Sequence, residues 1–146
     1  MTVSTEVRLL CDEVAKFVRE QVEPRSRWIE ENDAVPDDLI QLARDMYAVF
    51  AAGDRDTVER ILAEDFAFHA PPDPHLDRAG YFKRCWPGAG KGQSFEFLRL
   101  VESGDEVIVT YASSRADGSR FRNTEVLRFT GDQIREVEVY FGWNLD

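Results

Sequence analysis

Four strand-like segments, joined by short turns, fill the second half of this sequence, and they constrain its fold more than any other feature. Within each segment apolar residues alternate with polar ones or follow one another directly, as in half-buried and buried strands. The segments are residues 95–101, 107–113, 121–129 and 134–141. Each turn contains a glycine (Gly104, Gly118 or Gly131) beside serine or aspartate, which favours a tight reversal. The pattern therefore predicts a long antiparallel meander.

Helical patterns precede this meander. Apolar residues recur at helical spacing over residues 39–50 and end at Gly53, and a second short helix follows around Val58. A strand is expected at residues 66–70, before a proline-rich break, and then a helix capped by Asp77. Helices followed by a meander predict an α+β fold in which a strongly curved antiparallel sheet wraps around the helices.

The pattern of residues 1–38 differs and predicts a helical extension, separate from a domain at residues 39–146. Apolar residues lie at helical spacing among charged ones over residues 5–22, which indicates one amphipathic helix. Two more short helical segments are expected after it. The residues that indicate their limits and contents are Pro24, Trp28, Ile29 and Pro36.

Composition and charge restrict the class of protein and its partners. A chain of 146 residues with 43% apolar residues and ten phenylalanines suits a single domain with a sizeable core. Its net charge of −10 repels phosphate backbones and anionic lipids, so no nucleic acid and no membrane partner is expected. The sequence has no signal-like start and no apolar run long enough to span a bilayer, which predicts a cytoplasmic protein.

The cysteines and histidines do not form a recognisable ligand motif. Cys11 and Cys85 lie far apart, and the spacing of His69 and His75 is not that of a metal site. We therefore expect no disulfide, no metal and no cofactor.

Several sequence segments of the domain resemble those of a known family. Residues 47–54 and 61–68, together with 120–126 and 136–142, resemble the nuclear transport factor two-like superfamily, particularly its polyketide-cyclase-like (SnoaL-type) members. The resemblance implies a cone-shaped α+β barrel around an apolar pocket open at one end. It also implies a homodimer formed through the outer face of the sheet. Similar folds host isomerases, hydrolases, cyclases and proteins without any chemistry.

The extension shows a resemblance of its own. Residues 12–20 and 35–40 are similar to the opening helices of acyl-CoA dehydrogenases. Those enzymes are several times longer and bind flavin through segments that have no counterpart in this chain, so neither flavin nor dehydrogenase activity is expected. The extension is expected to cover the main domain or a dimer partner.

Ketosteroid isomerases of the superfamily use a base, a tyrosine and a protonated aspartic acid. Similarity to them places Ala70 at the base position and Met46 at the tyrosine position, where neither can do that chemistry. Tyr47 follows Met46 by one residue, which turns it by about 100° around the helix, so it is not expected to substitute. Glu125 is the one acid that matches, and the similarity implies a neutral carboxylic acid that donates a hydrogen bond to an oxyanion.

Strand alternation supports an inward position for Glu125. Asn123 and Glu125 share a strand face with Phe121 and Phe129, so both polar residues are expected in the pocket. A carboxylate in an apolar pocket has a raised pKa unless a cation pairs with it, and Arg99 is the expected cation. Two interpretations stay open: Glu125 and Asn123 are a catalytic or recognition pair, or Glu125 is a buried acid tied to arginine or backbone.

No motif identifies a general base. Limonene epoxide hydrolases of the superfamily carry an essential aspartate where this chain has Val139, so epoxide opening and aldol cyclisation are not expected. The candidate bases are His69 and a bound water. His69 alternates with Phe68 and Ala70 and would face outward unless the prolines bend the strand. His75 is expected in a surface loop.

The expected pocket wall is largely apolar and aromatic. Its residues are Met46, Phe68, Ala70, Trp86, Arg99, Tyr111, Val139 and Phe141. These features predict a protein that binds a small apolar or cyclic molecule, with isomerisation or another proton transfer as its chemistry. The alternative is a non-catalytic binding or dimerisation module with a plugged pocket. An open cavity of several hundred Å³ favours the first, and a pocket filled by Trp86 and Met46 favours the second.

Overall fold

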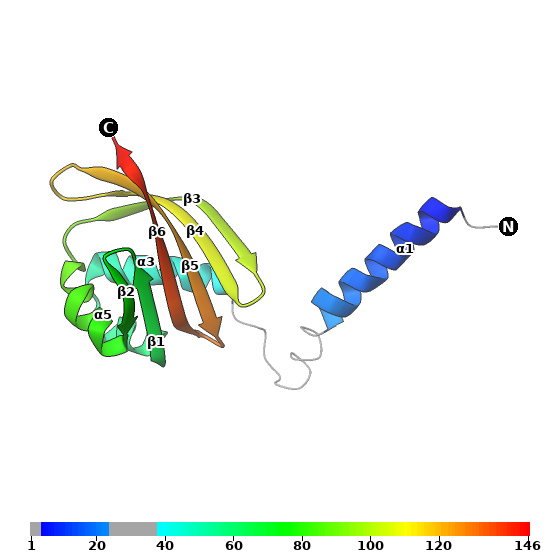
Figure 1. The fold of residues 1–146 in the computed structure, drawn as a ribbon, viewed down its shortest axis with the longest axis horizontal. Coiled ribbons are helices and arrows are strands. Elements are labelled where there is room, and N and C mark those ends of the chain that lie inside the picture. Colours follow the sequence, from blue (N-terminus) through cyan, green and yellow to red (C-terminus); the bar gives the residue numbers. More distant parts are fainter. Residues whose placement is uncertain (1–3, 24–37) are drawn as a thin grey trace. The chain divides into compact units, whose positions relative to one another are not determined.

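The computed structural model describes residues 4–23 and 38–146, and the chain forms two units, Met1–Pro36 and Asp37–Asp146. In the first unit the helix α1 (Thr5–Phe17) continues into a π-helical turn, η1 (Val18–Val22) (Figure 1). Ser4 caps α1 by accepting a hydrogen bond from the Val7 amide. The single helix expected at residues 5–22 is thus confirmed.

The apolar stripe of α1 is exposed in the structure as described for residues 4–23. No residue of α1 is buried, and Leu10 and Phe17 are both exposed. The helical segments expected around Pro24, Trp28, Ile29 and Pro36 lie outside the described residues.

Aspartates start the three α-helices of the second unit. Side chains of Asp38, Asp54 and Asp77 accept hydrogen bonds from backbone amides three residues later. The helices are α3 (Leu39–Ala52), α4 (Arg55–Ile61) and α5 (Arg78–Arg84), and α5 is followed by a short 3₁₀ turn, η2 (Trp86–Gly88). The sequence therefore predicted all three helices, and it predicted the cap of α5 at Asp77.

Gly53 ends α3 in the left-handed conformation, at φ 67°. A Cβ on Gly53 would lie 3.1 Å from the Cα of Gly90, which has a φ of 68°. Two glycines therefore let the end of α3 approach the loop before the third strand.

Six strands form one open, mixed sheet in the order β2-β1-β6-β5-β4-β3. The strands are β1 (Leu62–Ala70), β2 (Asp73–Asp77), β3 (Ser94–Ser103), β4 (Glu106–Ser114), β5 (Arg120–Thr130) and β6 (Gln133–Leu145). Strands β3 to β6 are the expected antiparallel meander, and β1 pairs with β6 in parallel.

The sequence did not predict β2. Prolines at 72 and 74 argue against a strand, but β2 lies at the edge of the sheet, where a missing amide donor costs no ladder hydrogen bond on the open side. β1 also begins earlier than expected, directly after α4, because Leu62 is buried and pairs with Ile134 of β6.

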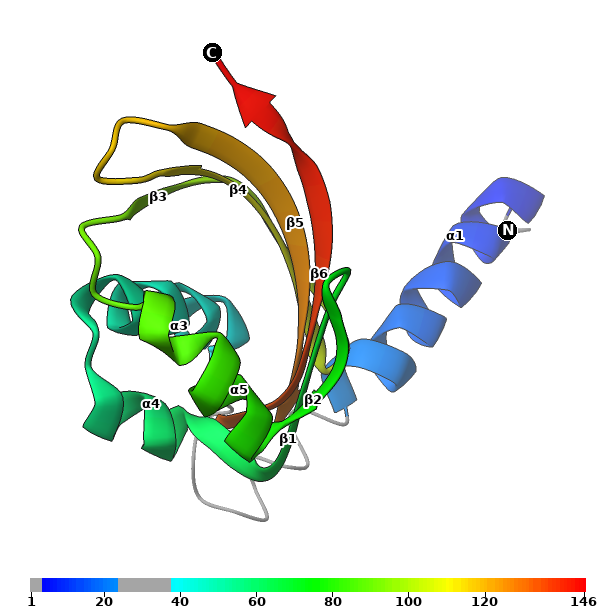
Figure 2. The ribbon, with the colours of Figure 1, turned by 60° about the vertical axis from the view of Figure 1, so that its left-hand side comes forward.

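The sheet is strongly curved, and α3 and α5 lie on its concave side (Figure 2). Buried apolar side chains from these helices meet those of the sheet to form the core. Among the largest fully buried side chains are Phe66, Leu62, Leu127 and Ile134. This arrangement confirms the expected α+β fold with a curved sheet around helices. No helix among the described residues is both long and apolar enough to cross a membrane.

Candidate functional site

A cavity of about 860 Å³ lies between the concave face of the sheet and the helices α3 and α5. Most of its wall is apolar or aromatic, with Met46, Phe50, Phe68 and Val139 among the lining residues. Charged and exposed residues line it as well, including Lys91, Arg115 and Asp117, and at these residues the cavity meets solvent. The cavity is therefore an apolar chamber with a polar rim.

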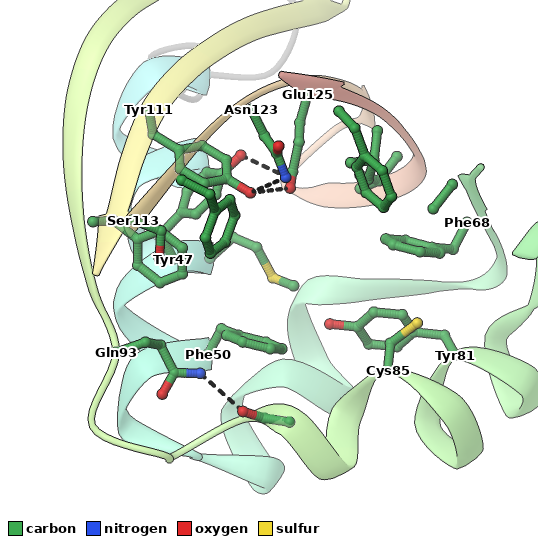
Figure 3. A pocket seen from close by; sticks show the side chains of 18 of the residues that line it. Tyr47, Phe50, Phe68, Tyr81, Cys85, Gln93, Tyr111, Ser113, Asn123 and Glu125 are labelled. Carbon is green, nitrogen blue, oxygen red and sulfur yellow. Dashed lines mark hydrogen bonds between the residues drawn. The ribbon is translucent and has the colours of Figure 1, made fainter. Parts of the chain in front are cut away.

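Glu125 projects into this chamber from β5, and two tyrosines hold its carboxylate (Figure 3). The Tyr47 hydroxyl, from α3, donates to Oε2 of Glu125 at 2.9 Å. The Tyr111 hydroxyl, from β4, donates to Oε1 at 2.8 Å. Each carboxylate oxygen thus accepts one phenol and keeps capacity to accept a further hydrogen bond from a ligand.

Asn123 precedes Glu125 on the same face of β5 and orients the second tyrosine. Its Nδ2 lies 3.4 Å from the Tyr111 hydroxyl, and its Oδ1 accepts a hydrogen bond from the Gly142 amide at 3.2 Å. The pairing of β5 with β6 shifts between Phe121 and Asn123, which leaves the Gly142 amide free for this side chain.

The protein environment raises the pKa values of Glu125, Tyr47 and Tyr111. Burial raises the pKa of Glu125, and the hydrogen bonds from Tyr111 and Tyr47 offset part of that rise. Burial and then the negative charge of Glu125 raise the pKa of Tyr47 and of Tyr111. The tyrosines therefore stay protonated donors, while the carboxyl group is easier to protonate than an exposed glutamate.

Eight of the residues expected at the site line the cavity: Met46, Phe68, Ala70, Tyr111, Asn123, Glu125, Val139 and Phe141. Phe141 is nevertheless 59% exposed, so it contributes to the wall only with part of its ring. The inner face of β5 and β6 is the one that alternation indicated.

Arg99 does not reach Glu125, so the expected ion pair is wrong. The pairing of β3 with β4 shifts between Phe97 and Arg99, and this bulge breaks the alternation that would place Arg99 on the inner face. Arg99 is exposed, and no described cation forms an ion pair with Glu125. Two phenols take the place of the expected guanidinium.

The exclusion of Tyr47 is also wrong. Both Met46 and Tyr47 are buried, because the curved sheet surrounds more than one face of α3. The ring of Tyr47 packs edge-on against Phe97 and Tyr111, with ring centroids 5.3 Å apart in both pairs. These contacts direct its hydroxyl toward Glu125, so a turn of one residue around the helix does not remove it from the site.

Trp86 and His69 do not line the cavity. Trp86 packs edge-on against Phe50 at 5.9 Å, behind the wall rather than in it. His69 has Nδ1 at 2.7 Å from the Pro74 carbonyl oxygen and Nε2 at 3.7 Å from the Glu136 carboxylate. It therefore follows the alternation of β1 away from the chamber, and the prolines do not turn it inward.

The sequence interpretation missed two hydroxyl groups of the wall, those of Tyr81 and Ser113. Tyr81 and Cys85 are four residues apart and share one face of the helix, a spacing that was visible in the sequence. Ser113 follows Tyr111 by two residues on β4 and so faces the same way. Among the described residues, no three Asp, Glu, His or Cys side chains are grouped to hold a metal ion.

Comparisons with known proteins agree with this fold. The profile of the family described as the SnoaL-like domain matches residues 43–137. A nuclear transport factor two-like protein of unknown function from Cytophaga hutchinsonii is 19% identical, with a TM-score of 0.56 over 69% of this chain and 87% of that chain.

Two proteins of similar structure have been given a provisional enzymatic assignment. A provisionally assigned ketosteroid isomerase from Kribbella flavida is 19% identical, with a TM-score of 0.58 over 73% of this chain and 78% of that one. A provisionally assigned polyketide cyclase from Sinorhizobium meliloti is 18% identical, with a TM-score of 0.59 over 68% of this chain and 94% of that one. At these identities the likeness shows a shared fold. No curated protein matches the chain.

Proposed function

Because the chain belongs to the SnoaL-like domain family, with the chamber described above, we propose that its larger unit binds a small, largely apolar cyclic molecule and transfers a proton at Glu125. The observation that carries this proposal is the position of Glu125. Its carboxylate lies on the wall of an apolar chamber and is held by the hydroxyls of Tyr47 and Tyr111.

The size and lining of the chamber support a ligand. A volume of about 860 Å³ is within the range of small-molecule sites, and the apolar wall with few polar groups is typical of them. A plugged pocket would have favoured a non-catalytic scaffold. Met46 lines the chamber without filling it, and Trp86 lies outside it.

The environment of Glu125 suits proton transfer. An ionised Glu125 can accept a proton from carbon next to a carbonyl group, since its two phenol contacts orient the carboxylate and leave lone pairs free. Burial then stabilises the neutral acid, which can return the proton to the same or to another carbon. Exchange at one carbon or isomerisation between two would result.

Deuterium exchange into 1-tetralone, a bicyclic ketone with acidic hydrogens beside its carbonyl, tests this proposal. We expect the protein to bind the ketone and to accelerate exchange, and Glu125→Gln to lower the rate by about 100-fold or more. Glu138→Gln, which changes a carboxylate outside the cavity on β6, should leave the rate unchanged. Exchange that persists in Glu125→Gln would refute the role of Glu125, and binding without exchange would favour the non-catalytic alternative.

The homodimer and the cytoplasmic location stay predictions. Sedimentation of the full chain, with a mass of 16.8 kDa for one copy, tests the first. Exposed apolar side chains on two strands, Leu98 and Val101 of β3 and Tyr140 of β6, support an association of this kind.

A further inference from the structure

Tyr81 brings a second hydroxyl group to the chamber, from the side opposite to the sheet. It lies on α5, is only 3% exposed, and lines the cavity. Figure 3 shows its hydroxyl on the helical side of the chamber and the Glu125 carboxylate on the side of the sheet. A molecule that fills the chamber would therefore meet both groups.

The hydroxyl of Tyr81 has no hydrogen-bond partner among the described residues, whereas those of Tyr47 and Tyr111 both bind Glu125. Buried polar groups in folded proteins are nearly always paired with protein, water or ligand. The Tyr81 hydroxyl is open to the chamber, so a molecule or a water inside the chamber is its available partner.

Packing does not explain why position 81 carries a hydroxyl. Three phenylalanines surround the ring: Phe66, Phe68 and Phe82, with centroids 5.2, 5.3 and 5.5 Å away. A phenylalanine at position 81 would make the same ring contacts without bringing a hydroxyl group to the chamber.

The protonation state makes this hydroxyl a donor. Burial raises the pKa of Tyr81, and the nearby Cys85 and Glu125 raise it further. A phenol that stays protonated can donate to a carbonyl oxygen, which is an acceptor only. The Cys85 thiol, with a pKa raised by burial to about 11, also stays neutral.

The geometry points to a second polar subsite, in which the Tyr81 hydroxyl donates a hydrogen bond to a ring carbonyl oxygen of the bound molecule while Glu125 faces its acidic C–H group. This inference rests on the proposed function and names its substrate class: cyclic ketones and lactones. When Glu125 takes the proton, the C–H electron pair moves toward the carbonyl carbon and the carbonyl electrons move to oxygen. The resulting enolate oxygen is then stabilised by the Tyr81 hydroxyl.

The test compares two probes with the same ring frame, 1-tetralone and tetralin, which lacks the carbonyl oxygen. We measure the affinity of the full chain for each, and the ratio of the two affinities reports the contribution of that oxygen. Tyr81→Phe should lower the preference for the ketone about tenfold, because it removes one hydrogen bond, and should leave tetralin binding unchanged. Tyr140→Phe, at an exposed tyrosine outside the cavity, should keep the wild-type ratio. Ser113→Ala, at the other missed hydroxyl of the wall, tests the competing donor.

A second measurement does not need the variant to fold. The carbonyl stretch of ¹³C-labelled 1-tetralone should move to lower frequency when the ketone binds the wild type, and a frequency as in an apolar solvent would overturn the inference. An unchanged affinity ratio in Tyr81→Phe, or a ratio lost in Ser113→Ala instead, would also overturn it. If 1-tetralone binds and exchanges but Tyr81→Phe keeps the wild-type affinity ratio, the Tyr81 subsite is refuted and the proposed function stands. If neither probe binds the wild type, the proposed function fails with it.

Discussion

The hydroxyl of Tyr47 donates a hydrogen bond to Glu125 at 2.9 Å, across 78 positions of the chain. This contact joins α3, the first helix of the domain, to β5 in the middle of the meander. Together with the bond from Tyr111 it gives both carboxylate oxygens a neutral donor. The carboxylate of Glu125 on the chamber wall is therefore stabilised by hydroxyl dipoles rather than by an opposite charge.

Removing either phenol should raise the pKa of Glu125 further. Hydrogen bonds to the charged form favour ionisation, so Tyr47→Phe and Tyr111→Phe each delete a contribution that lowers the pKa. Each variant should also lose about 1.5 kcal/mol of unfolding free energy. Carboxyl-carbon NMR titration measures the pKa, and an unchanged or lower value would contradict the hydrogen-bond assignment.

Tyr140→Phe provides a matched control for that titration. The Tyr140 hydroxyl donates to Glu138 at 2.9 Å and lowers the pKa of that exposed-face carboxylate. Its removal should raise the pKa of Glu138 and leave that of Glu125 unchanged.

Arg99→Ala should leave the pKa of Glu125 where it is. The β3 bulge places Arg99 in solvent, so no charge is lost near the carboxylate. The same NMR titration decides the matter, because loss of a nearby cation would raise the pKa of Glu125. A higher pKa of Glu125 in Arg99→Ala would show that the two residues form the ion pair expected from the sequence.

Glu125 should make the folded protein less stable as pH rises. Its pKa in the folded state is raised above the ordinary 4.5, so the folded state binds more protons than the unfolded state in the interval between the two values. The neutral acid is favoured below that interval, and stability is lost as pH climbs through it to the folded pKa. Glu125→Gln and Glu125→Leu should remove this loss, and urea unfolding at a series of pH values measures it. A stability profile that keeps the wild-type slope in both variants would exclude Glu125 as its source.

Gly142→Ala should destabilise the domain by about 3 kcal/mol through overpacking. A Cβ at this position would lie 2.1 Å from the carbonyl oxygen of Arg122, which is backbone and cannot turn aside. Gly88→Ala is the control, because its added Cβ would have nothing nearer than a Phe50 ring atom at 3.9 Å. Thermal unfolding of the two variants should differ by several degrees, and equal midpoints would refute the close approach at Gly142.

Local patterns were sufficient for most of the fold. The alternation along β5 placed Asn123 and Glu125 on the inner face, and Asp77 marked the start of α5. The edge strand β2 was not predicted, because Pro74 lies within it and Pro72 directly precedes it, and proline is rare in strands except at a sheet edge. The site was less predictable, since the position of Arg99 depends on a bulge and that of Trp86 on packing with a distant helix.

The sequence by itself determined the helices, the meander, its turn glycines and the inward direction of Glu125, because periodicity and turn chemistry act between residues close in the chain. Only the tertiary structure decided what surrounds that acid. The curvature of the sheet brings Tyr47 of α3 to β5, and the bulge after Phe97 turns Arg99 away. Both effects depend on how distant strands and helices pack, and no local pattern along one segment encodes them.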